Sequence, residues 1–312
     1  MPIKTVAVVG SGKQASGLVG LRVVKALQEK GFEVMAISRE SSTATFPSGV
    51  AVRKADLSSV ESLTAAFAGQ DAVISAISTV AVVVPGAQDP LIDAAVAAGV
   101  KRFVPSEYGL NTRTLEGEIL GDWLKAKTAA VDYLIKKADE NPGFTWTGIA
   151  TSLFLDWVGE LPNITRGIYG ISLENKRMTI FDSGNQKVST TSLSFLAEGI
   201  AAVLQHPAET VNKYINIVEF EVTQNQLHKL FEEETGAEFA IEHKTADEAE
   251  KAGKEKLAAG GRFPFEEFLQ KYWFGDGPGH AIREEEKANK VLGLPQSSLR
   301  EVVRRYIKEH ST

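Results

Sequence analysis

A glycine-rich turn directly after the first apolar strand pattern constrains this chain more than any other feature. Residues 5–9 are apolar and mostly β-branched, and Gly10, Gly17 and Gly20 follow around the start of a helical pattern at 18–30. A strand, a glycine turn and a helix in this order place backbone N–H groups where a pyrophosphate can bind. The six residues between Gly10 and Gly17 make the loop longer than a regular dinucleotide fingerprint. A flexible turn without a ligand is the alternative.

The first half of the chain alternates strand and helix patterns. We predict strands at 5–9, 33–38, 72–78, 102–105 and 145–150, and helices at 18–30, 60–67, 90–98 and 121–137. Such alternation, with fully apolar strands, predicts an α/β fold with a Rossmann-like, doubly wound parallel sheet.

The alternation stops after about residue 152, where we expect a smaller α+β domain. We predict helices at 192–204, 223–236, 246–259 and 299–309, strands at 175–186 and 214–217, a turn at Asp182-Ser183-Gly184-Asn185, and an aromatic-rich segment at 262–274. The predicted cofactor domain covers 1–152 and is rejoined by about 187–218, and the predicted substrate domain covers 153–186 and 219–312.

Composition excludes several classes of function. The chain of 312 residues has no cysteine, which excludes disulfides, thiolate metal sites and cysteine nucleophiles and fits a reducing compartment. Its net charge of −6 does not suit general nucleic-acid binding. No apolar run reaches the roughly 18 residues of a membrane span, and the five histidines are scattered without ligand spacing. We therefore expect a cytoplasmic protein without metal, nucleic acid or membrane partner.

The end of the second predicted strand carries information about the cofactor. An acidic residue there would accept a hydrogen bond from a ribose 2′-hydroxyl, whereas the guanidinium of Arg39 can pair with a 2′-phosphate. We therefore predict NADP(H) rather than NAD(H). A solvated Arg39 paired with Glu40 is the alternative. Asp56, in the run Lys54-Ala55-Asp56-Leu57, is placed either to meet the adenine amino group or to cap the next helix.

Several runs of residues along nearly the whole chain together resemble one known family. They are Gly10…Gly17-x-x-Gly20, Ser38-Arg39-Glu40-Ser41, Gly99-Val100-Lys101-Arg102-Phe103-Val104-Pro105-Ser106-Glu107-Tyr108-Gly109, Phe144-Thr145-Trp146, Phe154-Leu155-Asp156-Trp157 and Asp182-Ser183-Gly184-Asn185. This pattern resembles the NmrA-like, isoflavone reductase-like family, and the run from Lys101 to Gly109 is its most specific part.

The resemblance implies an atypical short-chain dehydrogenase fold that binds NADPH or NADP+. Enzymes of this family reduce plant phenylpropanoids and isoflavones, and other members bind NADP(H) without turnover and act as redox-responsive regulators. The residues expected to bind the cofactor are Gly10, Ser11, Gly12, Lys13, Gln14, Ser16, Gly17, Leu18, Arg39, Asp56, Ala76, Ile77, Ser78, Lys127, Ser152 and Leu153.

In the reductases that this chain resembles, a lone lysine replaces the tyrosine and lysine of short-chain dehydrogenases. The run from Tyr133 to Lys137 fits the usual Tyr-x-x-x-Lys spacing, but it lies too far along the helix from Ser106. Lys125 and Lys127 compete for the role. Residues two apart on a helix point in nearly opposite directions, and Lys127 lies within the apolar stripe while Lys125 falls to its side. We predict Lys127 as the general acid and base, with Lys125 as the second choice.

The strand ends that border the expected pocket carry aromatic residues. We predict that Tyr108, Phe154, Trp157 and Tyr169 contact a flat aromatic or unsaturated substrate; for Phe154 and Trp157 a purely structural place in the core is the alternative. The chain is thus expected to be an NADPH-dependent reductase, active as a monomer or a homodimer. A non-catalytic NADP(H)-sensing regulator that binds a partner protein is the alternative function.

Overall fold

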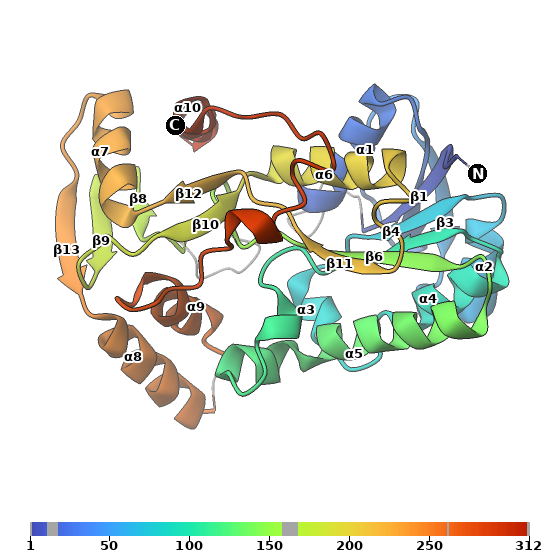
Figure 1. Ribbon diagram of the computed structural model, residues 1–312, viewed down its shortest axis with the longest axis horizontal. Coiled ribbons are helices and arrows are strands. Elements are labelled where there is room, and N and C mark those ends of the chain that lie inside the picture. Colours follow the sequence, from blue (N-terminus) through green and yellow to red (C-terminus); the bar gives the residue numbers. More distant parts are fainter. Residues whose placement is uncertain (1, 11–17, 158–167, 261, 311–312) are drawn as a thin grey trace.

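Seven parallel strands form the main sheet in the part of the chain that the computed structural model describes, residues 2–10, 18–157, 168–260 and 262–310 (Figure 1). Every neighbouring pair of strands in this sheet is parallel. In spatial order the strands are β11 (Lys213–Asn216), β6 (Thr145–Ala150), β5 (Arg102–Val104), β4 (Ala72–Ser75), β1 (Thr5–Val9), β2 (Glu33–Arg39) and β3 (Ala51–Ala55). The strand order reverses between β1 and β4, which is where ligands bind in sheets of this kind.

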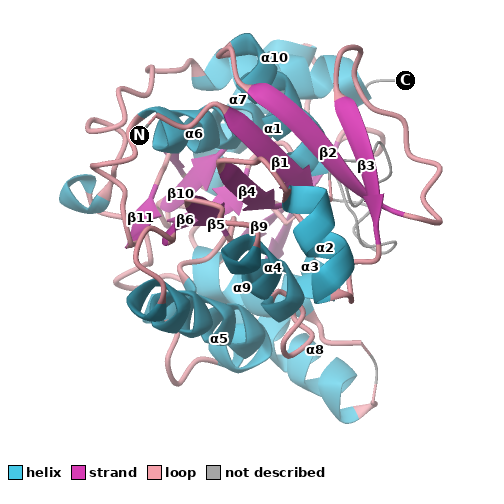
Figure 2. Cartoon of the chain, turned by 90° about the vertical axis from the view of Figure 1, so that its right-hand side faces the viewer, coloured by secondary structure: helices cyan, strands magenta, loops and turns pink. Residues whose placement is uncertain are grey.

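Helices cover both faces of the main sheet (Figure 2). Along β1, Val6 and Val8 face the core formed with α1 (Leu18–Glu29) and α6 (Leu193–Gln205), which pack against each other. Ala7 and Val9 point to the opposite core, formed with α2 (Val60–Phe67), α4 (Asp89–Ala97) and α5 (Ile119–Glu140). Since both faces of the strand are buried, its run is apolar throughout, and the doubly wound α/β fold is confirmed.

The second lobe is built from two small sheets and four helices among the described residues (Figure 1). One sheet contains β12 (Phe220–Val222), β10 (Val188–Thr191) and β7 (Leu153–Phe154); the other contains β13 (Ala240–Lys244), β9 (Arg177–Phe181) and β8 (Ile171–Ser172). The helices are α7 (Gln224–Thr235), α8 (Ala246–Ala258), α9 (Phe265–Phe274) and α10 (Leu299–His310). Shorter helical turns are α3 (Thr79–Val82), Thr112–Thr114 and Glu284–Glu286.

Local sequence signals explain several boundaries of these elements. The Thr223 side chain caps α7 in a capping box with Gln226, and Gly236 ends the helix in the left-handed conformation. The strand predicted over 175–186 is shorter, because Asp182 and Gly184 adopt positive φ angles in the turn that follows β9. The sequence did not predict β13 or the helical state of α9. No helix in the described part of the chain is long and apolar enough to span a bilayer.

Candidate active site

The carboxyl ends of β1 and β4 approach each other so closely that only a glycine fits at position 10, and we call this place the Gly10 crevice. Gly10 has a φ of +86°, and a Cβ atom there would lie 2.4 Å from the carbonyl oxygen of Ala76. The Ala76 N–H in turn donates to the Val9 carbonyl oxygen at 2.8 Å, so the two strand ends are tied together. This close approach of backbone to backbone fits the cradle of a dinucleotide.

Part of the predicted cofactor loop cannot be compared with the structure. Six predicted residues lie outside the described part of the chain: Ser11, Gly12, Lys13, Gln14, Ser16 and Gly17. Leu18 is the first residue of α1, in agreement with the predicted helix start.

Two basic side chains lie at the ends of β2 and β3. Arg39 is exposed at the end of β2, and its predicted alternative ion pair with Glu40 is not found among the described residues. Lys54 on β3 pairs in register with Ser38, and its Nζ donates to the carbonyl oxygens of Ser42 at 2.6 Å and Arg39 at 3.3 Å. The sequence analysis missed Lys54, because its place beside Arg39 depends on the register of β3 against β2.

Asp56 follows β3 and is exposed. Its carboxylate accepts hydrogen bonds from the N–H and the hydroxyl of Ser58, at 2.9 and 2.7 Å, and these bonds lower the pKa of Asp56. Ser59, not Asp56, caps α2 through the N–H of Ser62. The alternative prediction that Asp56 caps this helix is therefore wrong, because the cap lies three residues further along the chain.

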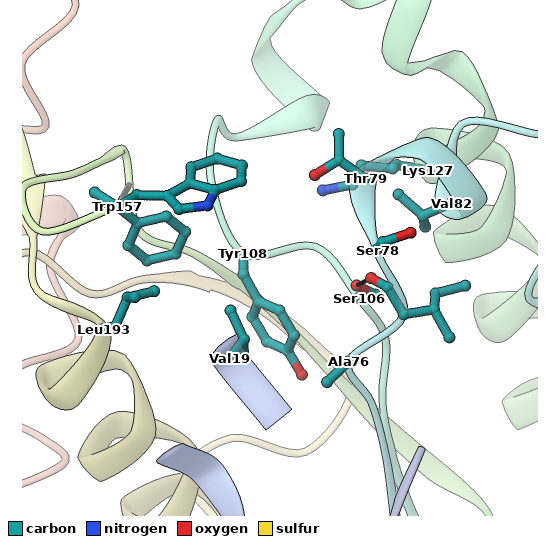
Figure 3. Close-up of a pocket in the computed structure, with 12 residues that line it drawn as sticks. Val19, Ala76, Ser78, Thr79, Val82, Ser106, Tyr108, Lys127, Trp157 and Leu193 are labelled. Atoms are coloured by element: carbon teal, nitrogen blue, oxygen red, sulfur yellow. Dashed lines mark hydrogen bonds between the residues drawn. The ribbon is translucent and has the colours of Figure 1, made fainter. Parts of the chain in front are cut away.

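A small cavity of about 40 Å³ opens beside the Gly10 crevice, between the loops that follow β4, β5 and β7 (Figure 3). Of the predicted site residues, Ala76, Ile77, Ser78, Tyr108, Lys127, Phe154 and Trp157 line it. The lining residues that the sequence analysis missed are Val19, Thr79, Val82, Ser106 and Leu193. They come from α1, α3, α6 and the loop after β5, so only the fold brings them together.

A second cavity, also of about 40 Å³, continues the first toward the second lobe. It shares Thr79, Tyr108, Lys127, Phe154 and Trp157 with the first cavity and adds Gly109, Leu110, Leu124, Ser152, Leu153, Ile168, Phe265 and Leu269. Phe154 and Trp157 meet edge to face, with ring centroids 5.8 Å apart. Both therefore belong to the wall of the cavity as well as to the packed interior.

Tyr169 is placed differently from its prediction. It is not among the residues that line the two cavities, and it is buried in the second lobe with its ring 5.7 Å from that of Phe274. Ile168, the residue before it, lines the second cavity instead. The sequence analysis also missed Phe265, although it noted the aromatic-rich segment that becomes α9.

Lys127 lines both cavities, and no other lysine of the described residues lines either one. Its side chain is buried, 7% of the residue is exposed, and its ammonium group donates to the carbonyl oxygen of Glu107. Burial lowers the pKa of Lys127, and the negative charge of Glu107 opposes this shift. Lys125 is exposed on the other side of α5, as the helical spacing predicts.

The Tyr-x-x-x-Lys run of α5 lies away from both cavities. The hydroxyl of Tyr133 donates to Asp93 of α4 at 2.8 Å, and Lys137 forms an ion pair with the same carboxylate at 2.7 Å. These contacts join two helices on one face of the main sheet, so the resemblance of this run to a dehydrogenase motif is a coincidence of spacing.

The carboxylate of Glu107 is fully buried in a network that the sequence analysis did not foresee. One of its oxygens accepts hydrogen bonds from the hydroxyls of Thr112 and Tyr214, both at 2.8 Å. Tyr214 comes from β11, and its ring lies over Gly148 of β6, where a Cβ atom would be 2.5 Å from the ring. Gly148 thus leaves the space through which Tyr214 reaches Glu107. Among the described residues, no three His, Cys, Asp or Glu side chains lie together in a way that could hold a metal ion.

Comparisons with known proteins agree with this geometry. A model of the NmrA-like family matches residues 2–256. The oxidoreductase aprR of Aspergillus flavus is 33% identical over 318 residues, which cover 99% of this chain and 100% of aprR. The oxidoreductase poxI of Penicillium oxalicum is 30% identical over 307 residues, covering 95% of this chain and 92% of poxI. The solved structure of AtPrR2 with NADP+ and (+)pinoresinol has the same fold, with a TM-score of 0.75 at 20% identity over 98% of this chain and 99% of that one.

Proposed function

The chain belongs to the NmrA-like family, and from this premise we propose that it is an NADPH-dependent reductase that transfers hydride to an aromatic, enone-type or benzylic small molecule. One observation carries the proposal: a buried lysine with a lowered pKa stands in the wall of a cavity that opens beside a dinucleotide cradle. The names of the oxidoreductase relatives support the class of reaction.

The preference for the phosphorylated cofactor rests on the basic side chains at the ends of β2 and β3. In a doubly wound sheet the adenosine ribose lies next to the end of the second strand. Arg39 is exposed there, and Lys54 anchors the turn that presents it. A 2′-phosphate would meet the guanidinium of Arg39 and the ammonium of Lys54, and the charges of these groups favour NADP(H) over NAD(H).

The remaining cofactor contacts that we propose follow the strand ends. They are Gly10 with Ser11, Gly12, Lys13, Gln14, Ser16, Gly17 and Leu18, then Asp56, Ala76, Ile77, Ser78, Lys127, Ser152 and Leu153. When bound, the nicotinamide ring of NADPH supplies the hydride.

The walls of the cavities favour a flat and uncharged substrate. Phe154, Trp157 and Phe265 supply aromatic surface, and Leu124 and Leu269 add aliphatic surface. Lys127 is the one basic group among the described residues that line either cavity. A substrate with aromatic rings and one oxygen, or one polarised double bond, directed at Lys127 matches this arrangement.

The part of the reaction that the protein's own residues carry out is the transfer of one proton. The Glu107 carbonyl oxygen holds the ammonium group of Lys127 at the wall of the cavity, and burial favours the neutral amine. With a phenolic benzylic ether, the neutral amine takes the phenol proton and gives it to the alkoxide that leaves as the benzylic C–O bond breaks. With an enone, the ammonium form gives a proton to the enolate that hydride addition leaves, and water replaces that proton. Apolar walls exclude the water that would compete for that proton.

A turnover screen tests the proposal. NADPH oxidation is followed by its absorbance in the presence of quinones, enones and phenolic benzylic ethers. We expect oxidation with at least one of these classes and a slower reaction with NADH. NADPH binding without turnover across the whole panel would contradict the enzyme proposal and favour the regulator that binds NADP(H) and a partner protein.

A further inference from the structure

The hydroxyl group of Tyr108 is buried and has no hydrogen-bond partner among the residues that the structure describes. Buried hydroxyls in folded proteins are nearly always paired, because an unpaired one loses its bonds to water without replacement. Tyr108 lines the cavity beside the Gly10 crevice. A ligand that brings an acceptor oxygen to this place would therefore gain a hydrogen bond that the protein alone does not make.

The direction of the side chain decides which ligand this is. In Figure 3 the ring of Tyr108 runs past Val19 toward Ala76, and its hydroxyl points away from Lys127. Val19 lies in the first turn of α1, and the carbonyl oxygen of Ala76 is the atom that the backbone of Gly10 approaches. The hydroxyl thus faces the crevice between β1 and β4, whereas Phe265 and Leu269 border the cavity at the second lobe.

The backbone around Tyr108 holds the ring in this direction. The N–H groups of Thr151 and Ser152 both donate to the carbonyl oxygen of Gly109 at 2.9 Å, and Lys127 donates to the carbonyl oxygen of Glu107. The ring itself packs against the core that α1 and α6 form with the sheet. Burial and the charge of Glu107 raise the pKa of Tyr108, so the group stays a neutral donor.

We propose that the Tyr108 hydroxyl donates a hydrogen bond to an oxygen atom in the nicotinamide half of the bound dinucleotide. This inference rests on the proposed function and moves Tyr108 from the predicted substrate contacts to the cofactor contacts. It divides the cofactor into two separately held halves: Arg39 and Lys54 at the adenosine 2′-phosphate, and Tyr108 at the other end of the crevice.

Binding of a whole and a truncated nucleotide tests this division. The Kd values of NADPH and of 2′,5′-ADP, which lacks the nicotinamide half, are measured by calorimetry for the wild type and for Tyr108→Phe. We expect the variant to weaken NADPH binding about tenfold, the effect of one hydrogen bond, and to bind 2′,5′-ADP as the wild type does. Tyr169→Phe is the matched control, because it removes a buried hydroxyl outside the two cavities and leaves both Kd values unchanged.

The possible outcomes separate this inference from the proposed function. An unchanged Kd for NADPH in Tyr108→Phe would overturn the inference, and so would an equal loss of affinity for both nucleotides. Absence of NADPH binding by the wild type would overturn the proposed function and the inference with it. Thermal unfolding of Tyr108→Phe at or above the temperature of the wild type excludes damage to the fold as the cause of weaker binding.

Discussion

The ammonium group of Lys127 donates a hydrogen bond to the main-chain carbonyl oxygen of Glu107. The buried carboxylate of the same residue raises the pKa of Lys127 by its negative charge. One residue of the loop after β5 therefore fixes the position of the lysine by its backbone and influences its charge by its carboxylate. The carboxylate in turn is held by Thr112 and Tyr214. The proposed proton-transfer group thus depends on a network that joins α5, the loop after β5, the helical turn Thr112–Thr114 and β11.

Lys127→Met tests the assigned role of the lysine. The substitution keeps an unbranched side chain of similar length but removes the group that moves the proton, so we expect turnover to fall at least about 100-fold. NADPH binding, measured by calorimetry, should weaken by no more than about tenfold, since one lost hydrogen bond is the largest effect expected. Lys125→Met, an exposed substitution on the same helix, is the matched control and should retain full turnover.

Lys127→Met also tests how the stability of the fold depends on pH. The folded pKa of Lys127 lies below its ordinary value of 10.5, so the unfolded chain binds the proton more tightly and the free energy of unfolding rises with pH between the two values. Lys127→Met should lose this rise and should melt at or above the wild-type temperature at pH 7. A large drop in its melting temperature would show that the ammonium group stabilises the fold.

Glu107→Gln tests the influence of the buried carboxylate on the lysine. The negative charge raises the pKa of Lys127, so its removal should lower that pKa, and the limb of the pH–rate profile that reports Lys127 should move to lower pH. A merely structural role would reduce the rate at every pH without moving the limb. Thr112→Val, which removes one donor and keeps the charge, serves as the control.

Gly148→Ala tests the space beneath Tyr214. The added methyl group would lie 2.5 Å from the ring, so we expect a loss of about 1–3 kcal/mol in the free energy of unfolding, measured with urea. Gly277→Ala, where no atom lies within 4 Å of the added group, should change stability by less than about 0.5 kcal/mol. In a Tyr214→Ala background the cost of Gly148→Ala should largely disappear; an equal cost there would contradict the proposed clash.

Phe265→Ala tests the contribution of α9 to the substrate pocket. Loss of this aromatic wall should raise the KM for an aromatic substrate about tenfold and leave the Kd of NADPH unchanged. Phe263→Ala is the control, since Phe263 stacks on Trp123 with centroids 4.7 Å apart but is not among the lining residues. Equal effects of both variants on KM would argue for a general disturbance of the aromatic cluster.

Periodicity predicted the first half of the fold well because its strands are buried on both faces. The helix expected at 60–67 has those bounds in the structure, and the four apolar residues that end β1 are all buried, as a strand covered on both faces requires. In the second lobe, β13 lies at a sheet edge and four of its five residues are exposed, so its sequence carries no apolar pattern. The sequence of β13 gives no sign of its parallel pairing with β9, some 60 residues away.

In the candidate site, too, local spacing predicted some residues, whereas contacts between distant parts of the chain were not predictable. Helical spacing alone separates the buried Lys127 from the exposed Lys125, because both lie on one regular helix. The contact of Tyr214 with Glu107 joins residues 107 positions apart and requires the missing side chain of Gly148, so no local pattern announces it. Ile168, and not the predicted Tyr169, lines the second cavity, since the course of the chain decides which of two apolar neighbours faces it.

Calorimetric titration of the wild type and of Arg39→Ser with NADPH and NADH tests the central claim, a cradle for a phosphorylated dinucleotide beside a poised lysine. We expect the wild type to bind NADPH at least about tenfold more tightly than NADH, and the variant to lose most of this preference while its affinity for NADH is unchanged. No heat from NADPH, or an undiminished preference in the variant, would contradict it.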